Sequence, residues 1–581
     1  MNPRHFASTF SESRRPLVKA PNFARLAKKT TTFDNFYAGS LPCMPARREM
    51  HTGRYNFLHR SWGPLEPFDD SMPEMLKQAG VHTHLVSDHQ HYWEDGGCTY
   101  HPRYNTWEFF RGQEGDNWKG DVEAVRGAPF PMDLKSQDVV NRRYMSTEAE
   151  HSQTRTVDAG LEFLDTNVSA DRWMLQIELF DPHEPFFAHK KYKDLYPENY
   201  DGPEFDWPEY GKVVEPADQI EHARREYRAL VAMCDYSLGR VLDFMDSHKM
   251  WDDTMLIVNT DHGFLLGEHG WWAKMLQPWF NELVHLPMFM WDPRVESAPT
   301  RRNDLAQTID IAPTLLNFFG VALGTDMLGL DLAAEVGTRP AALFGMHGGH
   351  VNVTDGRHVY MRASAEATNS PIEDFTLMPT HIRSRFEVSE LACWEPADQF
   401  SFTKGLRTMR IATPPNHRTN SWQHGTLLWD LETDPGQIAP IVDEDLEHHM
   451  ITLLLQLLRK NDAPSSLFER LGLPLRGDAR DEHLRVAKDS TRACSTADPI
   501  PDLFDLPALG LLQASMHTLL TNDAARQVLE KHIPWLAKTE LVAITPWASV
   551  LEMAKVGALD SATLRAVAAE LAQLPAHPQA T

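Results

Sequence analysis

The sequence predicts an α/β protein in which a central, mostly parallel sheet is followed by a small antiparallel sheet and an appended helical tail. Short apolar, strand-like runs alternate with helical patterns as far as about residue 340, and this alternation is typical of a parallel sheet covered by helices. Beyond Gly320 the runs become short β-like pieces, and from Leu503 onward the apolar spacing is helical. A chain of 581 residues is also too long for one ordinary compact domain.

These changes of pattern predict four segments. Residues 1–340 form the α/β domain, 341–473 a smaller sheet subdomain, 474–502 a linker and 503–581 a helical appendage. The linker is assigned because its region is rich in Pro, Asp, Arg and Ser, residue types that favour connecting segments.

The clearest helix of the α/β domain is predicted at 221–249. Apolar residues recur there at the three-and-four spacing of one buried face. Cys234 lies on this face, and we therefore expect it in the core.

The later segments contain weaker element signals. In the sheet subdomain, 358–362 and 426–431 predict strands, and 446–459 predicts a helix packed on them. The clearest helices of the appendage are 524–532 and 561–574, the second with Asp560 as N-cap.

The composition excludes several classes of partner. Acidic side chains number 81 against 56 basic ones, a formal net charge of -25, which opposes attraction to nucleic acid or to an anionic membrane. No apolar run approaches the roughly 20 residues that span a bilayer, and no signal-peptide pattern opens the sequence. We therefore expect a cytoplasmic protein with no nucleic-acid or membrane partner. The five cysteines are scattered, so disulfides are not expected to hold the fold.

Three predicted strands each end in a polar cluster. The strand at 173–180 is followed by Asp-Pro-His-Glu-Pro-Phe at 181–186. The strand at 254–260 is followed by Asp261-His262-Gly263, and the strand at 83–87 is followed by Asp88-His89-Gln90-His91. Ligands of open α/β sheets bind outside the carboxyl ends of the strands. We therefore expect these clusters to converge on one crevice.

The most specific signal surrounds Cys43, in a run C-x-P-x-R that ends at Arg47 and continues to Arg54. Pro45 suits the first turn of a helix, because a backbone N–H is not needed there. Cys43 would then lie at the positive end of the helix, and Arg47 would add a fixed cation one turn further on. Such an arrangement can hold an anionic group. For an isolated residue the alternative is an ordinary buried cysteine in front of a helix.

This run resembles the signature of the type I sulfatases, the arylsulfatase family of the alkaline phosphatase superfamily. The resemblance covers most of residues 19–473 and implies an alkaline-phosphatase-like α/β sandwich with a small C-terminal sheet. It also implies that Cys43 is converted to formylglycine, whose hydrated aldehyde attacks a sulfate monoester. A formylglycine-generating enzyme would then be the maturation partner, and a small-molecule or carbohydrate sulfate ester would be the substrate.

The resemblance also implies a metal site. Asp261 and His262 would bind one divalent ion, Ca²⁺, Mn²⁺ or Mg²⁺, together with residue 43 in its modified form. Calcium prefers shells made entirely of oxygen, whereas imidazole suits Mn²⁺ and other transition ions. His262 therefore moves the expectation away from strict calcium.

Four more residues receive catalytic roles from the resemblance. Arg47 and Lys274 would supply positive charge around the sulfate, and His91 would contact formylglycine. His183 would give a proton to the departing alcohol oxygen, a role that suits an ordinary imidazole pKa of about 6.5.

The start of the sequence departs from the family. Members usually begin with an apolar strand that ends in metal-binding aspartates, whereas this sequence has no aspartate before Asp34. We expect either that the start codon has been placed too late or that the chain lacks this strand and a metal ligand. Three functions stay open: hydrolysis of sulfate monoesters, hydrolysis of phosphonate monoesters or phosphodiesters by the same residues, and non-catalytic binding of an anion.

Overall fold

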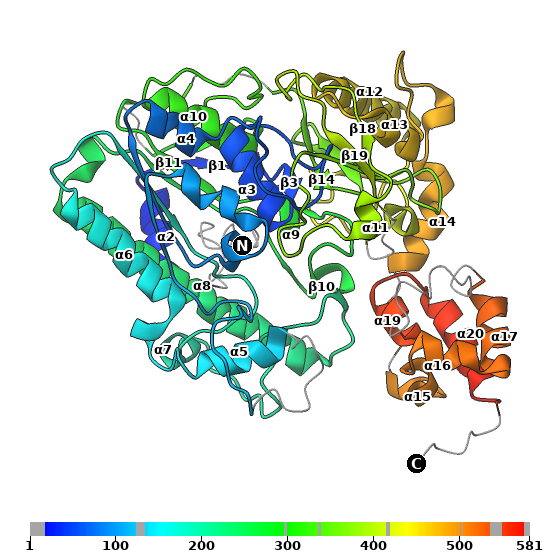
Figure 1. The fold of residues 1–581 in the computed structure, drawn as a ribbon. Helices are drawn as coiled ribbons and strands as arrows, with labels where there is room; N and C mark the ends of the chain where they lie inside the picture. The colour runs from blue at the N-terminus through cyan, green and yellow to red at the C-terminus, as the bar shows by residue number, and fades with distance from the viewer. Residues whose placement is uncertain are drawn as a thin grey trace.

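The computed structural model describes residues 18–123, 134–295, 299–334, 339–413, 419–497, 499–501, 503–534 and 549–574. The question of a first strand falls on residues 1–17, outside the described part. Within it, an α/β domain is followed by a smaller sheet with helices and then by a helical module (Figure 1). The predicted α/β class is confirmed. None of the helices described is long and apolar enough to cross a membrane.

The two larger sheets of the α/β domain differ in strand direction. One is wholly parallel, with β4 (His82–Ser87) between β5 (Thr106–Phe109) and β6 (Trp173–Glu178). The other has the order β12 (Arg301–Arg302), β1 (Thr31–Phe33), β11 (Met288–Trp291), β8 (Leu256–Asn259). β11 runs antiparallel to both of its neighbours. The chain between β8 and β11 forms the hairpin of β9 (Leu265–Leu266) and β10 (Trp271–Ala273). The predicted parallel order therefore holds for the first sheet, and the second is mixed.

Helices pack on these sheets in two groups. The 31-residue α8 (Ala217–Ser247) contacts α2 (Pro21–Ala27) and α6 (Ser152–Thr166), and the three lie side by side in Figure 1. This confirms the helix predicted at 221–249, and Cys234 is buried on it as expected. The second group consists of α3 (Cys43–Thr52), α4 (Met72–Gln78) and α10 (Ile311–Phe318).

The smaller sheet is antiparallel among β14 (Ala342–Met346), β15 (Val351–Thr354), β16 (His358–Arg362) and β20 (Leu427–Asp430). β3 (Ser40–Leu41) joins it in parallel to β14. The segment immediately before α3 therefore belongs to this sheet. α12 (Glu444–Lys460) and α13 (Ser465–Leu471) contribute apolar side chains to its core. The strand and helix signals of this region are confirmed within two residues of their predicted bounds.

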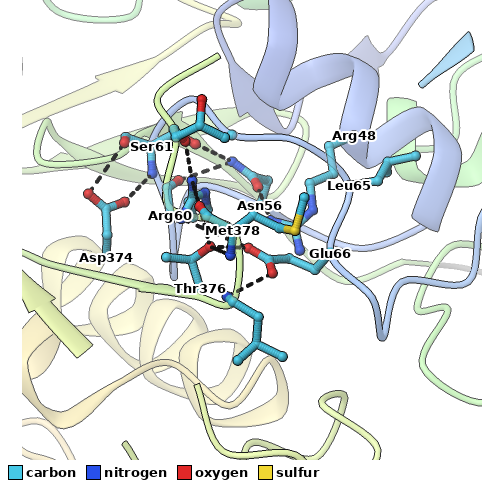
Figure 2. Close-up of polar contacts among 12 residues, drawn as sticks. Arg48, Asn56, Arg60, Ser61, Leu65, Glu66, Asp374, Thr376 and Met378 are labelled. Atoms are coloured by element: carbon cyan, nitrogen blue, oxygen red, sulfur yellow. Dashed lines mark hydrogen bonds and ion pairs between the residues drawn. The ribbon is translucent and has the colours of Figure 1, made fainter. Parts of the chain in front are cut away.

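Polar contacts also tie the start of the α/β domain to the smaller subdomain. Figure 2 shows the loop after α3 bonded to the chain around residues 374–378, through the pairs Ser61–Asp374 (2.8 Å) and Arg60–Met378 (3.1 Å). The same loop is bonded to α3 itself through Arg48 and Asn56 at 2.8 Å. Buried hydrogen-bonded networks of this kind fix the relative position of the segments they join.

The prediction of a linker at 474–502 is partly wrong. It contains α14 (Val486–Ala497), whose Asp489 is buried and accepts a hydrogen bond from the backbone of Thr426 at 3.0 Å. The polar composition suggested a connector, but Val486 joins the apolar core of the small sheet. A helix that buries one face needs few apolar residues when it also bonds the backbone of its neighbour.

The C-terminal helical module, defined here as residues 503–534 and 549–574, has a core of its own. Its helices are α15 (Leu509–Leu512), α16 (Met516–Thr521), α17 (Asp523–His532), α19 (Val550–Lys555) and α20 (Ser561–Leu571). Asp560 caps α20 by accepting from the backbone N–H of Thr563, as predicted.

The remaining elements of the described residues are short. They are α5 (Leu134–Arg142), α7 (Lys190–Lys193), α9 (Asn281–Val284), α11 (Val388–Leu391), β2 (Phe36–Tyr37), β7 (Gly211–Lys212), β13 (Ala306–Gln307), β17 (Glu373–Thr376), β18 (Glu395–Pro396), β19 (Met409–Ala412) and several single turns of 3-10 helix.

We predict that Leu454→Ala lowers the free energy of unfolding by about 2–5 kcal/mol, because Leu454 on α12 is fully buried in the core of the small sheet. Chemical denaturation followed by circular dichroism measures this change. Ile438→Ala is the control, since Ile438 is 74% exposed, and its effect should stay within about 0.5 kcal/mol. Equal effects of the two substitutions would contradict the assigned core.

Candidate functional site

Helix α3 presents residue 43 at its start. Cys43 is the first helical residue, Pro42 is the N-cap, and the cysteine side chain is buried. Pro45 lies in the first turn, where its missing N–H breaks no helical bond. Gly53 ends the helix with a φ of 62°, a conformation that favours glycine. The sequence prediction that Cys43 lies at the positive end of a helix is confirmed.

Side chains from three other segments meet at Cys43. His262 Nε2 lies 3.1 Å from Cys43 Sγ, and Lys274 Nζ lies 3.5 Å from it. Lys274 Nζ also donates to His183 Nε2 at 2.7 Å. The chain segments after β6 and β8 therefore converge on the start of α3, as expected for strand ends of an α/β sheet. Lys274 comes instead from the loop after β10, a strand of the separate sheet that also contains β7 and β9.

Arg47 bridges two carboxylates beside Cys43. Its Nε donates to Glu178 at 2.5 Å, and its Nη1 donates to Asp261 at 2.8 Å and to the carbonyl oxygen of Cys43 at 3.1 Å. All of these side chains are largely shielded from solvent. Arg47 thus links α3 to the ends of β6 and β8 at a single buried point.

Burial and charge shift the proton equilibria of the site. Burial raises the pKa of the Cys43 thiol to about 11, although Lys274 acts in the opposite direction. Burial alone would also raise the pKa of Asp261, but the charges of His262, Arg47 and Lys274 outweigh it and hold that pKa well below its usual range. For His262, burial lowers the pKa to about 3 against the attraction of Asp261. The thiol and the imidazole are therefore neutral near pH 7, and the carboxylate is ionised.

The residues of this cluster can hold a metal ion. Cys43, Asp261 and His262 each offer one ligand atom, and the three atoms lie within 4.8 Å of one another. His262 Nδ1 donates to the carbonyl oxygen of Gly263 at 2.9 Å, which leaves the Nε2 lone pair directed at the cluster. One imidazole and one carboxylate beside residue 43 fit a transition ion such as Mn²⁺ better than Ca²⁺, which takes six to eight oxygen ligands.

His91 lies apart from this cluster. Its Nδ1 is 2.7 Å from Glu94 and its Nε2 is 3.5 Å from Glu114, so its ring is engaged by carboxylates rather than by Cys43. The neighbouring His89 points instead at Met44, with Nε2 3.2 Å from the sulfur. The resemblance assigned the contact to His91 in preference to His89, with little in the local pattern to separate the two, because successive residues around a 3-10 turn face different directions.

Sequence reasoning missed three side chains that support the site. Glu178, the last residue of β6, holds Arg47. Glu184 accepts a hydrogen bond from Tyr210, and one of its carboxylate oxygens lies 3.1 Å from His183 Nδ1. Glu184 lies within the polar cluster that follows β6, and Glu178 ends the strand before it, so their place near the strand end was a usable signal. Nothing in the sequence around Tyr210 indicates its contact.

Comparison with solved structures shows that the fold is shared with proteins of known structure. The chain is similar to the phosphonate monoester hydrolase of Agrobacterium radiobacter, with a TM-score of 0.51, 16% identity, and coverage of 84% of this chain and 94% of that one. It is also similar to BT4656, solved with its substrate D-glucosamine-2-N,6-O-disulfate, with a TM-score of 0.53, 14% identity, and coverage of 78% and 94%. At such identities the likeness shows the fold alone.

The sequence model described as Sulfatase matches residues 6–321, more than half of the chain. The chain therefore belongs to the sulfatase family. Among curated relatives, it is 26% identical over 352 residues to the choline-sulfatase of Rhizobium meliloti, covering 54% of this chain and 65% of that protein. It is 24% identical over 374 residues to the N-acetylglucosamine-6-O-sulfatase of Bacteroides thetaiotaomicron, covering 54% and 66%. The matches thus span just under two thirds of the length of these relatives.

We predict that Glu49 makes stability depend on pH. Glu49 lies on α3, is fully buried, and accepts a hydrogen bond from the backbone of Ser40 at 2.6 Å. Burial raises its pKa to about 7, so the folded protein binds this proton more tightly than the unfolded chain does. The stabilisation is therefore complete below about pH 4 and is lost as the pH rises through about 7.

Glu49→Gln should remove this dependence, because the amide cannot ionise. Denaturation at several pH values between about 4.5 and 7.5 measures it: the free energy of unfolding of the unsubstituted protein should fall with rising pH relative to that of the variant. Glu108→Gln, at a half-exposed position of β5, is the matched control. Parallel profiles for the unsubstituted protein and Glu49→Gln would contradict the assignment.

Proposed function

We propose that the protein hydrolyses sulfate monoesters, with residue 43 in its formylglycine form and one divalent metal ion beside it. The observation that carries this proposal is the position of Lys274, whose Nζ reaches both Cys43 Sγ at 3.5 Å and His183 Nε2 at 2.7 Å. A buried ammonium between these two groups is suited to hold the sulfate where attack and departure of the alcohol both occur. Membership of the sulfatase family supports the same chemistry.

Binding falls to the cations of the site. A sulfate ester is an anion and repels an anionic nucleophile, so its reaction requires positive charge at the bound oxygens. Lys274 is almost fully buried, where a charge acts more strongly than in water. Arg47 is held by Asp261 and Glu178, and its role is to orient Asp261 and to balance the two carboxylates.

His183 handles the proton of the departing alcohol. Its Nδ1 donates to the carbonyl oxygen of Glu184 at 2.7 Å, which leaves Nε2 as the nitrogen that faces Lys274 and the site. Burial and the charge of Lys274 lower the pKa of His183 well below the ordinary value. An anionic ester bound beside Nε2 would raise that pKa, so that the ring takes up a proton from solvent when substrate binds and gives it to the alcohol oxygen as the S–O bond breaks.

The proposed reaction also needs a metal ion and the aldehyde hydrate of residue 43. When bound, the metal ion would lower the pKa of the attacking hydroxyl, which the aldehyde hydrate would supply. Asp261 and His262 would hold the ion together with residue 43. A formylglycine-generating enzyme would be the maturation partner. The substrate would be a small-molecule or carbohydrate sulfate ester, since the related proteins include sulfatases named for both kinds.

A second candidate is hydrolysis of phosphonate monoesters or phosphodiesters at the same site. The pairing of Asp261 with His262, rather than with an oxygen ligand, favours it, because the imidazole suits transition ions that also serve phosphoryl chemistry. The fold similarity to phosphonate monoester hydrolases is compatible with both candidates.

We predict that Cys43→Ala abolishes release of sulfate from an aryl sulfate ester while leaving the circular dichroism spectrum unchanged. Alanine cannot be converted to an aldehyde, so no hydrate oxygen is available. The mass of the peptide that contains residue 43 distinguishes thiol from aldehyde directly.

A phosphonate monoester is assayed in parallel, and a higher kcat/KM for it would favour the second candidate. Full turnover by Cys43→Ala would refute both, and purified protein without stoichiometric divalent metal would favour a non-catalytic anion-binding role.

We predict that Lys274→Met lowers kcat/KM for a sulfate ester at least about hundredfold, since it removes the cation that lies between residue 43 and His183. Methionine is one atom shorter than lysine and keeps an unbranched apolar stem without the charge. Steady-state kinetics measures the effect, and Lys190→Met, at an exposed helical position, is the matched control. Equal kinetics of Lys274→Met and the unsubstituted protein would exclude the assigned role.

A further inference from the structure

The C-terminal helical module packs on the strand that leads into Lys274. β10 is paired with β7 and β9 in a three-stranded sheet of the α/β domain. The module contacts this three-stranded sheet through residues 555–559. Val556 belongs to the same buried cluster as Trp271 and Leu276 of the α/β domain. Ala558 packs against that cluster and also against the module's own core. The turn at 555–559 therefore joins the two cores.

Two glycines allow close contact between the module and the sheet there. Gly557 has a φ of 78°, and a Cβ at this position would lie 2.7 Å from the ring of Trp271. On the facing strand, a Cβ at Gly211 would lie 3.0 Å from the carbonyl oxygen of Lys555. Separations this short leave no room for a side chain between the module and the sheet. The ring of Trp271 is consequently held by the module and almost fully buried.

The loop that follows β10, residues 273–277, has a strained backbone. Lys274 is flanked by Ala273 with a φ of 68° and by Met275 with a φ of 85°. Residues with a Cβ rarely adopt this left-handed region, and they keep it only where surrounding contacts hold them. Two hydrogen bonds hold this loop: Gln277 Nε2 donates to the Ala273 carbonyl at 3.0 Å, and His424 Nε2 lies 2.9 Å from the Leu276 carbonyl oxygen.

His424 connects these supports to the module. Its ring packs edge-on against Trp271, with centroids 5.9 Å apart, and its Cε1 lies 3.6 Å from the position of a Cβ at Gly557. Trp271, His424 and the turn at 555–559 thus form one packed unit beneath the loop. Removing the turn would expose Trp271 and loosen the histidine that bonds the loop backbone.

We propose that residues 555–559 of the C-terminal helical module are a positioning element for Lys274. By packing on Trp271 and His424, they hold the loop 273–277 in the strained conformation that directs Lys274 Nζ to residue 43. The kinetic consequence rests on the proposed function, whereas the placement of the lysine does not. Residues 555–559 act through Lys274 and do not themselves reach the site.

The first test measures the placement of Lys274 without any assay of activity. In the full-length chain, Val556→Asp introduces a carboxylate into a buried apolar cluster and should separate the turn from Trp271. Lys274 should then become accessible to an amine-reactive acylating reagent. The extent of its acylation, measured by peptide mass spectrometry, should rise about tenfold. Leu511→Asp makes the same chemical change at an exposed position of the module and should leave Lys274 protected. Val556→Ile should also leave it protected.

Gly557→Leu is the second variant, because its side chain would be placed directly against Trp271. It should raise the acylation of Lys274 as Val556→Asp does. Lys274 that stays protected in both variants would overturn the proposal. Circular dichroism shows whether either variant has lost the fold of the α/β domain, in which case Gly557→Ala supplies the milder change.

The second test uses kinetics and a double substitution. Val556→Asp should lower kcat for a sulfate ester about tenfold or more, since a small displacement of a catalytic group has effects of this order. On the background of Lys274→Met the same substitution should cause no further loss, because the cation that it displaces is already gone. A further loss of equal size on that background would overturn the proposal. If the unsubstituted protein releases no sulfate, the proposed function fails, and the acylation test still decides the placement of Lys274.

Discussion

The buried ion pairs of Arg47 are the interaction on which the site depends. A single guanidinium, fixed one turn into α3, bonds the last residue of β6 and the carboxylate that follows β8. Burial would raise the pKa of the Asp261 carboxyl, but His262, Arg47 and Lys274 together hold that pKa well below its usual range. The same side chain also bonds the carbonyl oxygen of Cys43. The Arg47 guanidinium thus fixes the positions of the β6 end, the β8 end and the start of α3 relative to one another.

Around this anchor the molecule assembles positive charge for an anion in stages. The start of α3 contributes unpaired backbone donors, Lys274 contributes a buried ammonium beside residue 43, and neutral His183 and His262 complete the surroundings without adding negative charge. Only Asp261 supplies an ionised ligand to the metal cluster. The arrangement suits a site that must bind a metal ion and an anionic ester at the same time.

Local pattern was sufficient for the elements and for the start of the site. The apolar spacing near Cys234 predicted α8, the alternation near Tyr360 predicted β16, and Pro45 placed Cys43 at a helix start. The pattern failed where a contact with another segment decides the structure. The polar composition before Asp489 suggested a linker, although α14 packs on the small sheet. The direction of His91 depends on Glu94 and Glu114, which no spacing around the histidine reveals.

The sequence by itself determined which residue types are available and in which element each lies, because capping, periodicity and motif spacing act over a few residues. Only the tertiary structure decided which of them meet. Glu178 reaches Arg47 across 131 positions, and Lys274 reaches Cys43 across 231. Contacts at such separations follow from how sheets and helices pack as whole units. The place of Lys274 further depends on a backbone held in a left-handed conformation by its neighbours, a feature that local preference would have counted as unfavourable.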